Sequence, residues 1–222
     1  MLDSIKGALT DEEFVKCYTL LAKTYWKKGK DYTTGKEAQM ATFELGRAVL
    51  DAAQEKLSGK KIERDSYAAE CRVFQFLYWM ALLHGEYGSA KGIMESLSLV
   101  GPIKNLCNAV IKLNPNYEDG GAYLVLGRMY YKLPGLFGGS NDESIKDLLL
   151  CRAEMEKKSP EDRSHTVYKF LAETYMSDKE YAKAKEALEI GLKTPKNKDN
   201  PKEDDAGYKE MEDLLVKAKS KL

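Results

Sequence analysis

The sequence predicts an all-α protein built from consecutive pairs of helices. Apolar residues recur at helical spacing along most of the 222 residues, which is typical of amphipathic helices. Helix start and stop signals bound these segments. One order of aromatic and small residues occurs four times, which indicates a repeat architecture. Together these observations predict about nine helices and no strand.

Three polar segments predict where helices begin. Thr10-Asp-Glu-Glu13 and Ser140-Asn-Asp-Glu143 both fit a capping box, in which a hydroxyl and a glutamate satisfy the first backbone N–H groups. Ser159-Pro160-Glu161-Asp162 offers a capping serine, then a proline suited to the first helical position, then acids that suit the helix dipole. Predicted stops lie at Gly29, Gly59, Gly101-Pro102, Asn114-Pro115, Pro134-Gly135 and Pro195.

The clearest copy of the repeat is "YKFLAETYMSDKEYAKAKEALEIGL", which spans Tyr168 to Leu192. Its aromatic residues alternate with the small residues Ala172 and Ala184, so that two helices can approach each other closely. Further copies start at Tyr18, Phe74 and Tyr123. This pattern resembles the tetratricopeptide (TPR) repeat, a helix–turn–helix unit. The resemblance implies a TPR-like α-solenoid of about four helix pairs, with Gly127 and Ala172 at close helix–helix contacts.

Three of the four copies carry extra residues between their two helices, and Leu133–Ser140 is one such insertion. Pro134 ends the first helix, Gly135 tolerates a left-handed backbone, and two further glycines let the chain turn before the next helix. Leu136 and Phe137 lie at the tip. They either plug the gap between repeats or form the wall of a ligand pocket or partner surface, and the sequence leaves both interpretations open.

The whole chain, residues 1–222, is predicted to form a single TPR-like domain. Residues 193–206 are polar and contain prolines, so they are expected to form a mobile loop. Residues 207–222 are expected to form a helix that caps the last repeat. The apolar residues that support this helix are Met211, Leu214, Leu215, Ala218 and Leu222.

Net charge and hydropathy bear on partners and location. Lys and Arg total 35, as do Asp and Glu, so the chain has no basic excess that would favour nucleic acid. No apolar run approaches the ~20 residues of a membrane-spanning helix. The start "MLDSIKGALTDEEF" does not read as a signal peptide. The protein is therefore expected in the cytoplasm if Met1 is the true start, and in the periplasm or cell envelope if a leader has been trimmed.

Residues that could carry chemistry are few, and we expect a non-enzymatic protein without cofactor or metal. The cysteines Cys17, Cys71, Cys107 and Cys151 lie far apart in apolar helical patterns, which favours buried free thiols over disulfides or metal ligands. His84 and His165 lack partners at a catalytic spacing. The glycine-rich turn lacks the lysine of a phosphate-binding loop.

The stretch "LNPNYEDGGAYLVLGRMYYKLPGLFGGS", followed by "LAETYMSDKEYAKAKEAL", resembles the T-component family of tripartite ATP-independent periplasmic (TRAP) transporters. The resemblance covers 101–192 well and the first hundred residues loosely. It implies an all-helical envelope protein that associates with a periplasmic substrate-binding protein and holds a small apolar or organic-acid ligand. The alternative is a cytoplasmic TPR scaffold that binds peptides and assembles other proteins, and a homo-oligomer is a further option.

In TPR folds the first helix of each pair lines a concave groove. Counted from the leading aromatic residue, the groove positions include seven cations (Lys16, Lys23, Lys27, Arg72, Arg128, Lys132, Lys169) and one anion (Glu173). This count predicts a basic groove with aromatic walls, suited to an acidic peptide or an organic carboxylate. Alternatively, the insertions shift the register, or the few charges are uneven by chance. The candidate binding residues are Lys23, Trp26, Arg72, Trp79, Tyr123, Arg128, Tyr131, Lys132, Leu136 and Phe137.

Overall fold

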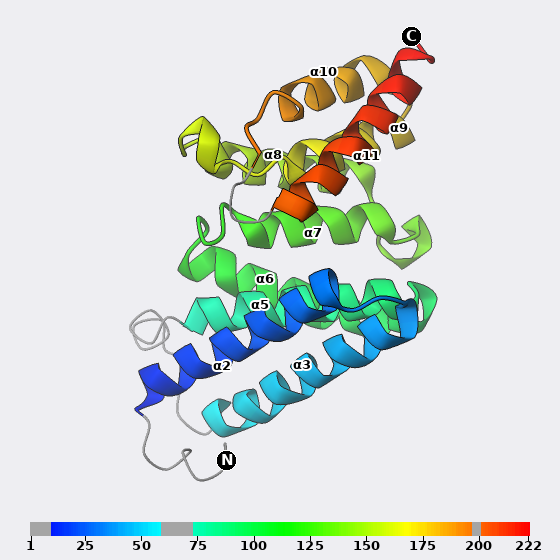
Figure 1. Cartoon of the computed structure of the whole chain (residues 1–222). Coiled ribbons are helices and arrows are strands. Elements are labelled where there is room, and N and C mark those ends of the chain that lie inside the picture. Colours follow the sequence, from blue (N-terminus) through cyan, green and yellow to red (C-terminus); the bar gives the residue numbers. More distant parts are fainter. Residues whose placement is uncertain (1–9, 59–72, 197–200) are drawn as a thin grey trace. The chain divides into compact units, whose positions relative to one another are not determined.

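The computed structural model describes residues 10–58, 73–196 and 201–222 (Figure 1). These residues form α-helices and short helical turns without a strand, which confirms the predicted all-α class. The α-helices are α2 (Asp11–Lys27), α3 (Lys36–Ser58), α5 (Val73–Lys91), α6 (Val100–Leu113), α7 (Gly121–Lys132), α8 (Asn141–Met155), α9 (Thr166–Ser177), α10 (Tyr181–Gly191) and α11 (Pro201–Lys219).

The chain divides into two compact units, Met1–Tyr117 and Glu118–Leu222, and each is described by itself. The prediction of one continuous domain stays a prediction. Within each unit, helices that follow one another in sequence pack against one another, as expected for helix pairs. None of the described helices is both long and apolar enough to cross a membrane.

The first unit contains α2, α3, α5 and α6. The helices α2 and α3 pack against each other and both pack against α5, which in turn packs against α6. Leu50, Phe76 and Leu83 are fully buried between these helices. Gly46 permits the close approach of α3 to α2, because a Cβ atom at this position would lie 2.9 Å from the Cβ of Tyr25.

Two predicted stops in the first unit are wrong. Helical backbone continues past Gly29 as a π-helical turn, η1 (Lys28–Tyr32). Gly29 is buried there, and an added Cβ would lie 2.2 Å from the Phe43 ring, so this glycine serves close packing. Gly101-Pro102 lies inside the first turn of α6. A proline is accepted at that position because the first backbone N–H groups of a helix have no intrahelical acceptor.

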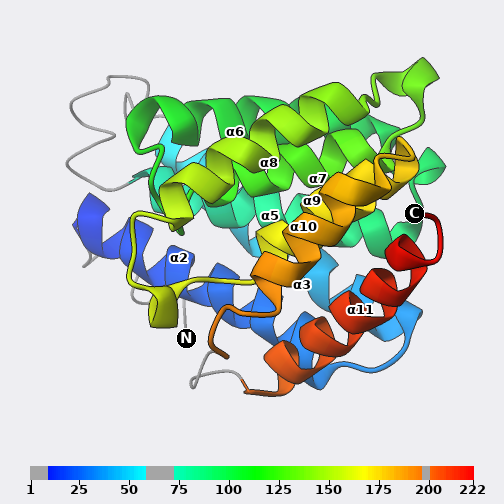
Figure 2. The same cartoon turned by 90° about the horizontal axis from the view of Figure 1, so that it is seen from above.

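The second unit consists of the pairs α7–α8 and α9–α10 followed by α11. Each helix packs on the next, and α9 also contacts α7 and α11. Figure 2 shows α8 alongside α7. Gly127 of α7 lies against Leu148 of α8, and a Cβ on Gly127 would be 2.7 Å from the Leu148 Cγ atom. Ala172 is fully buried. The close contact predicted at Gly127 is confirmed, and the close helix–helix contact at Ala172 stays a prediction.

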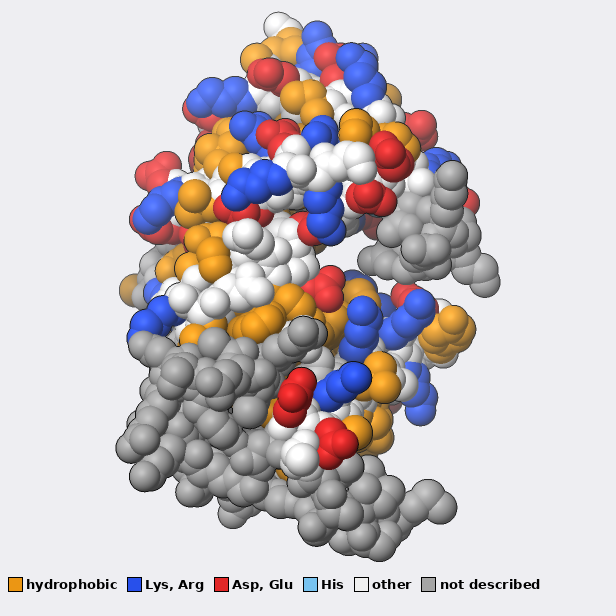
Figure 3. Space-filling view, turned by 90° about the vertical axis from the view of Figure 1, so that its left-hand side faces the viewer, with side chains coloured by type: hydrophobic (Ala, Val, Ile, Leu, Met, Phe, Trp, Pro, Cys, Tyr) orange, Lys and Arg blue, Asp and Glu red, His pale blue; other side chains and the backbone are white. Residues whose placement is uncertain are grey.

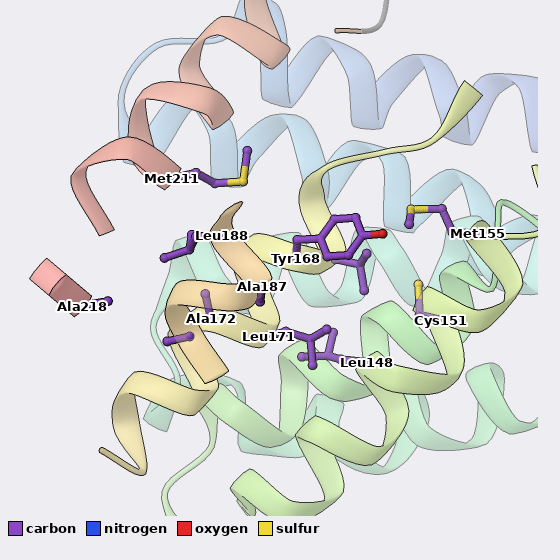
Figure 4. Close-up of a cluster of buried hydrophobic side chains, with 12 residues drawn as sticks. Leu148, Cys151, Met155, Tyr168, Leu171, Ala172, Ala187, Leu188, Met211 and Ala218 are labelled. Atoms are coloured by element: carbon purple, nitrogen blue, oxygen red, sulfur yellow. The ribbon is translucent and has the colours of Figure 1, made fainter. Parts of the chain in front are cut away.

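The core of the second unit draws one or more side chains from each of four helices (Figure 4). Leu148 comes from α8, Tyr168 and Leu171 from α9, Leu188 from α10, and Met211 from α11. The Tyr168 hydroxyl reaches the core's edge and donates a hydrogen bond of 2.8 Å to the Glu156 carboxylate. Because the core includes α11, this last helix is part of the packing of the unit.

Of three predicted helix starts, two agree with the structure and one does not. Thr10 caps α2 through the predicted capping box, and the Ser140 hydroxyl accepts a hydrogen bond from the Glu143 backbone N–H at the start of α8. The predicted helix start at Ser159 is wrong. Pro160–Asp162 forms a short 3-10 turn, η4, and α9 begins only at Thr166.

The C-terminal helix exists as predicted but begins earlier. It starts at Pro201 rather than Gly207, so the predicted loop is helical from residue 201 onward, and its residues 197–200 lie outside the described part of the chain. Gly207 is buried, and an added Cβ there would lie 2.1 Å from the His165 Nε2 atom. His165 itself precedes α9 and does not lie in its first turn.

Candidate binding surfaces

An aromatic cluster in the first unit brings together three of the predicted binding residues. The rings of Trp26 on α2 and Trp79 on α5 have centroids 5.5 Å apart. The Trp79 indole N–H donates a hydrogen bond of 3.1 Å to the Tyr117 hydroxyl. The Lys23 ammonium lies 5.3 Å from the centroid of Trp79. Trp79 is only 4% exposed, so its ring belongs to the core, and a ligand would meet Lys23 and the half-buried Trp26 instead.

Lys23 belongs to a row of exposed side chains along α2, which we call the α2 stripe: Lys16, Leu20, Lys23 and Lys27. At 100° per residue these four positions fall within an arc of about 60°, and they span about 16 Å along the helix. Leu20 is 65% exposed. No ion pair is present for the three lysines in the described part of the chain. The α2 stripe is therefore a basic surface that also presents one exposed apolar side chain, Leu20.

Arg128 of α7 lies in a different environment, in the second unit. Its guanidinium forms an ion pair with the Glu173 carboxylate of α9. It also stacks over the Phe170 ring at 4.1 Å and lies 5.1 Å from the Tyr131 centroid. Burial, and then the negative charge of Glu173, raise the pKa of Tyr131. Arg128 therefore joins α7 to α9, and its charge is compensated within the unit.

The positive charge of Lys169, on α9, is compensated as well. Lys169 pairs with Glu210 of α11 at 2.7 Å. Because Glu210 does not belong to the predicted groove positions, the count of seven cations and one anion overstates the positive charge in this unit. The face shown in Figure 3 likewise carries basic and acidic side chains intermixed.

The remaining predicted residues are scattered. Tyr123, at the start of α7, packs against the core of the second unit, and burial followed by the charge of Glu154 raises its pKa. Lys132 is exposed at the end of α7. Arg72 lies outside the described residues. Tyr123 and Lys132 belong to the second unit, whereas Lys23 and Trp26 belong to the first.

Leu136 and Phe137 lie at the tip of the turn between α7 and α8, which we call the α7–α8 turn (Leu133–Ser140). Figure 2 shows this turn projecting past the helix ends. Leu136 is 89% exposed and Phe137 is 38% exposed. The interpretation in which both side chains plug a gap between repeats is therefore wrong. The exposed tip fits the other interpretation, a surface for a partner.

An open groove in the second unit was not predicted, and we call it the α8–α10 groove. It has a volume of about 680 Å³. Ile145, Leu149, Leu150 and Tyr175 supply its apolar surface, and its charged residues are Asp142, Lys146, Asp178, Glu180 and Lys183. The run Leu148-Leu149-Leu150 was a usable signal. Three consecutive apolar residues on a helix cannot all face one core, and Leu148 alone is fully buried.

Among the described residues, no three His, Cys, Asp and Glu side chains are placed to hold a metal ion. Both histidines are buried. Burial, and then the nearby Arg47 charge, lower the pKa of His84. Cys107 and Cys151 are buried free thiols as predicted, but the same prediction is wrong for Cys17, which is exposed, and Cys71 lies outside the described residues.

This difference between the cysteines predicts selective labelling. Burial raises the pKa of the Cys151 thiol to about 12, so almost no thiolate is available at neutral pH, whereas Cys17 is exposed. Native protein treated with iodoacetamide is expected to be labelled at Cys17 within minutes and at Cys151 only after unfolding. Peptide mapping by mass spectrometry measures both sites. Equal native labelling of the two would contradict the burial of Cys151.

No protein-family model matches the chain, and no curated protein sequence matches it. The fold and these surfaces define the class only as an all-α protein of packed helix pairs.

Proposed function

We propose that this chain is a non-enzymatic binding protein of the TPR-like helical-repeat type, and that it takes an acidic segment of another protein. Two features of the second unit support the repeat. The first helices α7, α9 and α11 contact one another in succession, and the second helices α8 and α10 each pack between neighbours. The close packing of Gly127 on Leu148 and the burial of Ala172 are consistent with small residues between paired helices.

The observation that carries the function is the α2 stripe. Its three lysines are exposed on one face of α2 beside the half-buried Trp26, and Leu20 adds an apolar contact. Exposed ammonium groups that form no ion pair within the described residues can form charge-assisted hydrogen bonds with carboxylates at little desolvation cost. In the second unit, by contrast, Arg128 and Lys169 already have carboxylate partners. The proposed contact surface is therefore α2.

The identity of the partner rests on the resemblance to the T-component family. On that basis we propose a periplasmic substrate-binding protein as the partner and a small apolar or organic-acid molecule as a ligand. A cytoplasmic peptide-binding scaffold is the second candidate, and an exposed basic stripe supports both equally. Nucleic acid is disfavoured, because three lysines without an overall basic excess are a small electrostatic footprint.

The α2 stripe predicts charge-dependent binding of acidic peptides. Lys23→Glu is expected to weaken binding of a fluorescein-labelled decaglutamate peptide about tenfold, which corresponds to ~1.4 kcal/mol. Added salt is expected to weaken binding to the parent protein in the same direction, because exposed charges are screened. Fluorescence anisotropy measures both effects.

Lys209→Glu is the matched control for this experiment. Lys209 is an exposed lysine on α11, so the variant changes the net charge equally but leaves the α2 stripe intact. It should bind the peptide like the parent protein. Equal weakening by both variants, or binding that is insensitive to salt, would rule out the α2 stripe as the contact surface.

A further inference from the structure

The α7–α8 turn holds its apolar tip in a fixed conformation. The backbone N–H groups of Phe137 and Gly139 both donate to the Pro134 carbonyl, at 2.9 and 3.1 Å, and the Ser140 N–H donates to Tyr130 at 3.1 Å. Gly138 has a φ of 89°, a conformation that favours glycine. A Cβ on Gly139 would lie 1.7 Å from the Leu133 carbonyl oxygen. An apolar group displayed on a pre-ordered turn loses little entropy on binding.

The tip is followed in sequence by α8, which forms one wall of the α8–α10 groove. Phe137 precedes Asp142, the first groove residue of α8, by only five positions. The Asn141 side chain between them donates hydrogen bonds to Ser177 at 3.1 Å and to Asp178 at 2.5 Å, which ties the foot of the turn to the end of α9. Leu136 is nevertheless 89% exposed, so the tip does not enter the groove of its own chain.

The groove matches the tip in polarity. Its apolar surface includes Leu150, which is 43% exposed, and the partly buried Ile145, Leu149 and Tyr175. The turn Leu133–Ser140 contains no charged residue. An uncharged apolar tip can therefore enter the groove without burying an unpaired charge.

The charges around the groove also suit a second copy of the chain. Lys146 and Lys183 lie near Asp142, Asp178 and Glu180, so both signs are present on one rim. Lys146 also pairs with Glu143 at 3.1 Å and Lys183 with Glu180 at 2.9 Å, and both of these pairs are solvent-exposed. Two such rims that face each other can oppose lysine to carboxylate, whereas a rim of one sign would repel its copy. A two-fold axis makes every contact occur twice, so that each tip meets the other chain's groove.

We infer that two copies of this chain form a symmetric dimer in which the Leu136–Phe137 tip of each copy enters the α8–α10 groove of the other. The surface belongs to the second unit and is independent of the α2 stripe. Sedimentation equilibrium from about 1 to about 200 μM is expected to show a reversible monomer–dimer equilibrium. Leu136→Ser at the tip and Leu150→Ser in the groove are each expected to weaken the dimer by tenfold or more.

Mixing these two variants tests the geometry. In the mixed dimer the intact tip of the Leu150→Ser chain meets the intact groove of the Leu136→Ser chain, so one of the two contacts is restored. The mixture is expected to dimerise more strongly than either variant alone. Both replaced side chains are exposed, so circular dichroism should show the parent's helicity and thermal unfolding.

Val216→Ser is the matched control, because Val216 is an exposed apolar residue of α11 that lines neither the tip nor the groove. It should dimerise like the parent protein. Three outcomes would overturn the inference: a parent protein that stays monomeric over the whole concentration range, a mixture no stronger than its components, or a control variant that weakens the dimer equally.

Discussion

Replacing Gly127 with leucine is expected to lower the free energy of unfolding by ~1–3 kcal/mol. The cause is overpacking between α7 and α8. A Cβ atom alone would lie 2.7 Å from the Leu148 Cγ atom and 3.1 Å from the Ser144 carbonyl oxygen. Backbone cannot move aside as a flexible side chain can, so the two helices must separate. Urea denaturation followed by far-UV circular dichroism measures the change.

Gly85→Ala is the control for this prediction. Gly85 also lies within a helix, α5, but an added Cβ there would meet nothing within 4 Å. Alanine is a better helix former than glycine, so this variant is expected to gain ~0.5–1 kcal/mol. A Gly127→Leu protein that unfolds at the same urea concentration as the parent would show that α7 and α8 do not meet at this position.

Replacing Met211 with alanine is expected to cost ~2–5 kcal/mol, because the variant leaves a cavity between α11 and the rest of the second unit. The Met211 side chain is fully buried, and its sulfur would lie 2.9 Å from a Cβ on Gly191 of α10. The packing of α11 on α9 and α10 depends on this contact. Thermal and urea unfolding both report the loss.

Val216→Ala provides the comparison on the same helix. Val216 is 69% exposed, so its truncation should change the stability by no more than ~0.5 kcal/mol. If Met211→Ala were as stable as Val216→Ala, α11 would not be part of the core. Limited proteolysis of the two variants gives a second measure, because a loosened α11 becomes accessible to cleavage.

Some of the predicted binding residues contact partners that are close in sequence, and others contact partners that are far away in sequence. Only contacts of the first kind could be predicted. Lys23 and Trp26 lie on one helix, and their nearness follows from helical spacing alone. The ion pair of Arg128 with Glu173 joins residues 45 positions apart and could not be read from the local pattern. The same holds for Lys169 and Glu210. A count of charges along first helices therefore overestimated the positive charge of the second unit.

The solvent exposure of large apolar side chains could not be predicted from the local sequence pattern either. Leu136 and Trp79 are both large apolar residues, yet one is 89% exposed and the other 4% exposed. Trp79 contacts its chain neighbour Tyr78 and also Trp26 and Tyr117, which come from distant parts of the first unit. No comparable neighbours cover the tip of the α7–α8 turn. The α8–α10 groove likewise arises only where side chains of α8, α9 and α10 meet.

The sequence by itself determined the helical class, the paired arrangement and several helix ends. Each of these leaves a signal in the local sequence, either as helical spacing of apolar residues, as a capping motif or as a small residue on a helix. Thr10 and Glu13 form the capping box of α2, and Gly127 is small where α8 passes close by. The tertiary structure alone decided where α9 and α11 begin, which charges are compensated, and which apolar side chains remain exposed. These depend on contacts between segments far apart in the chain, and neither hydrophobic periodicity nor capping motifs encode such contacts.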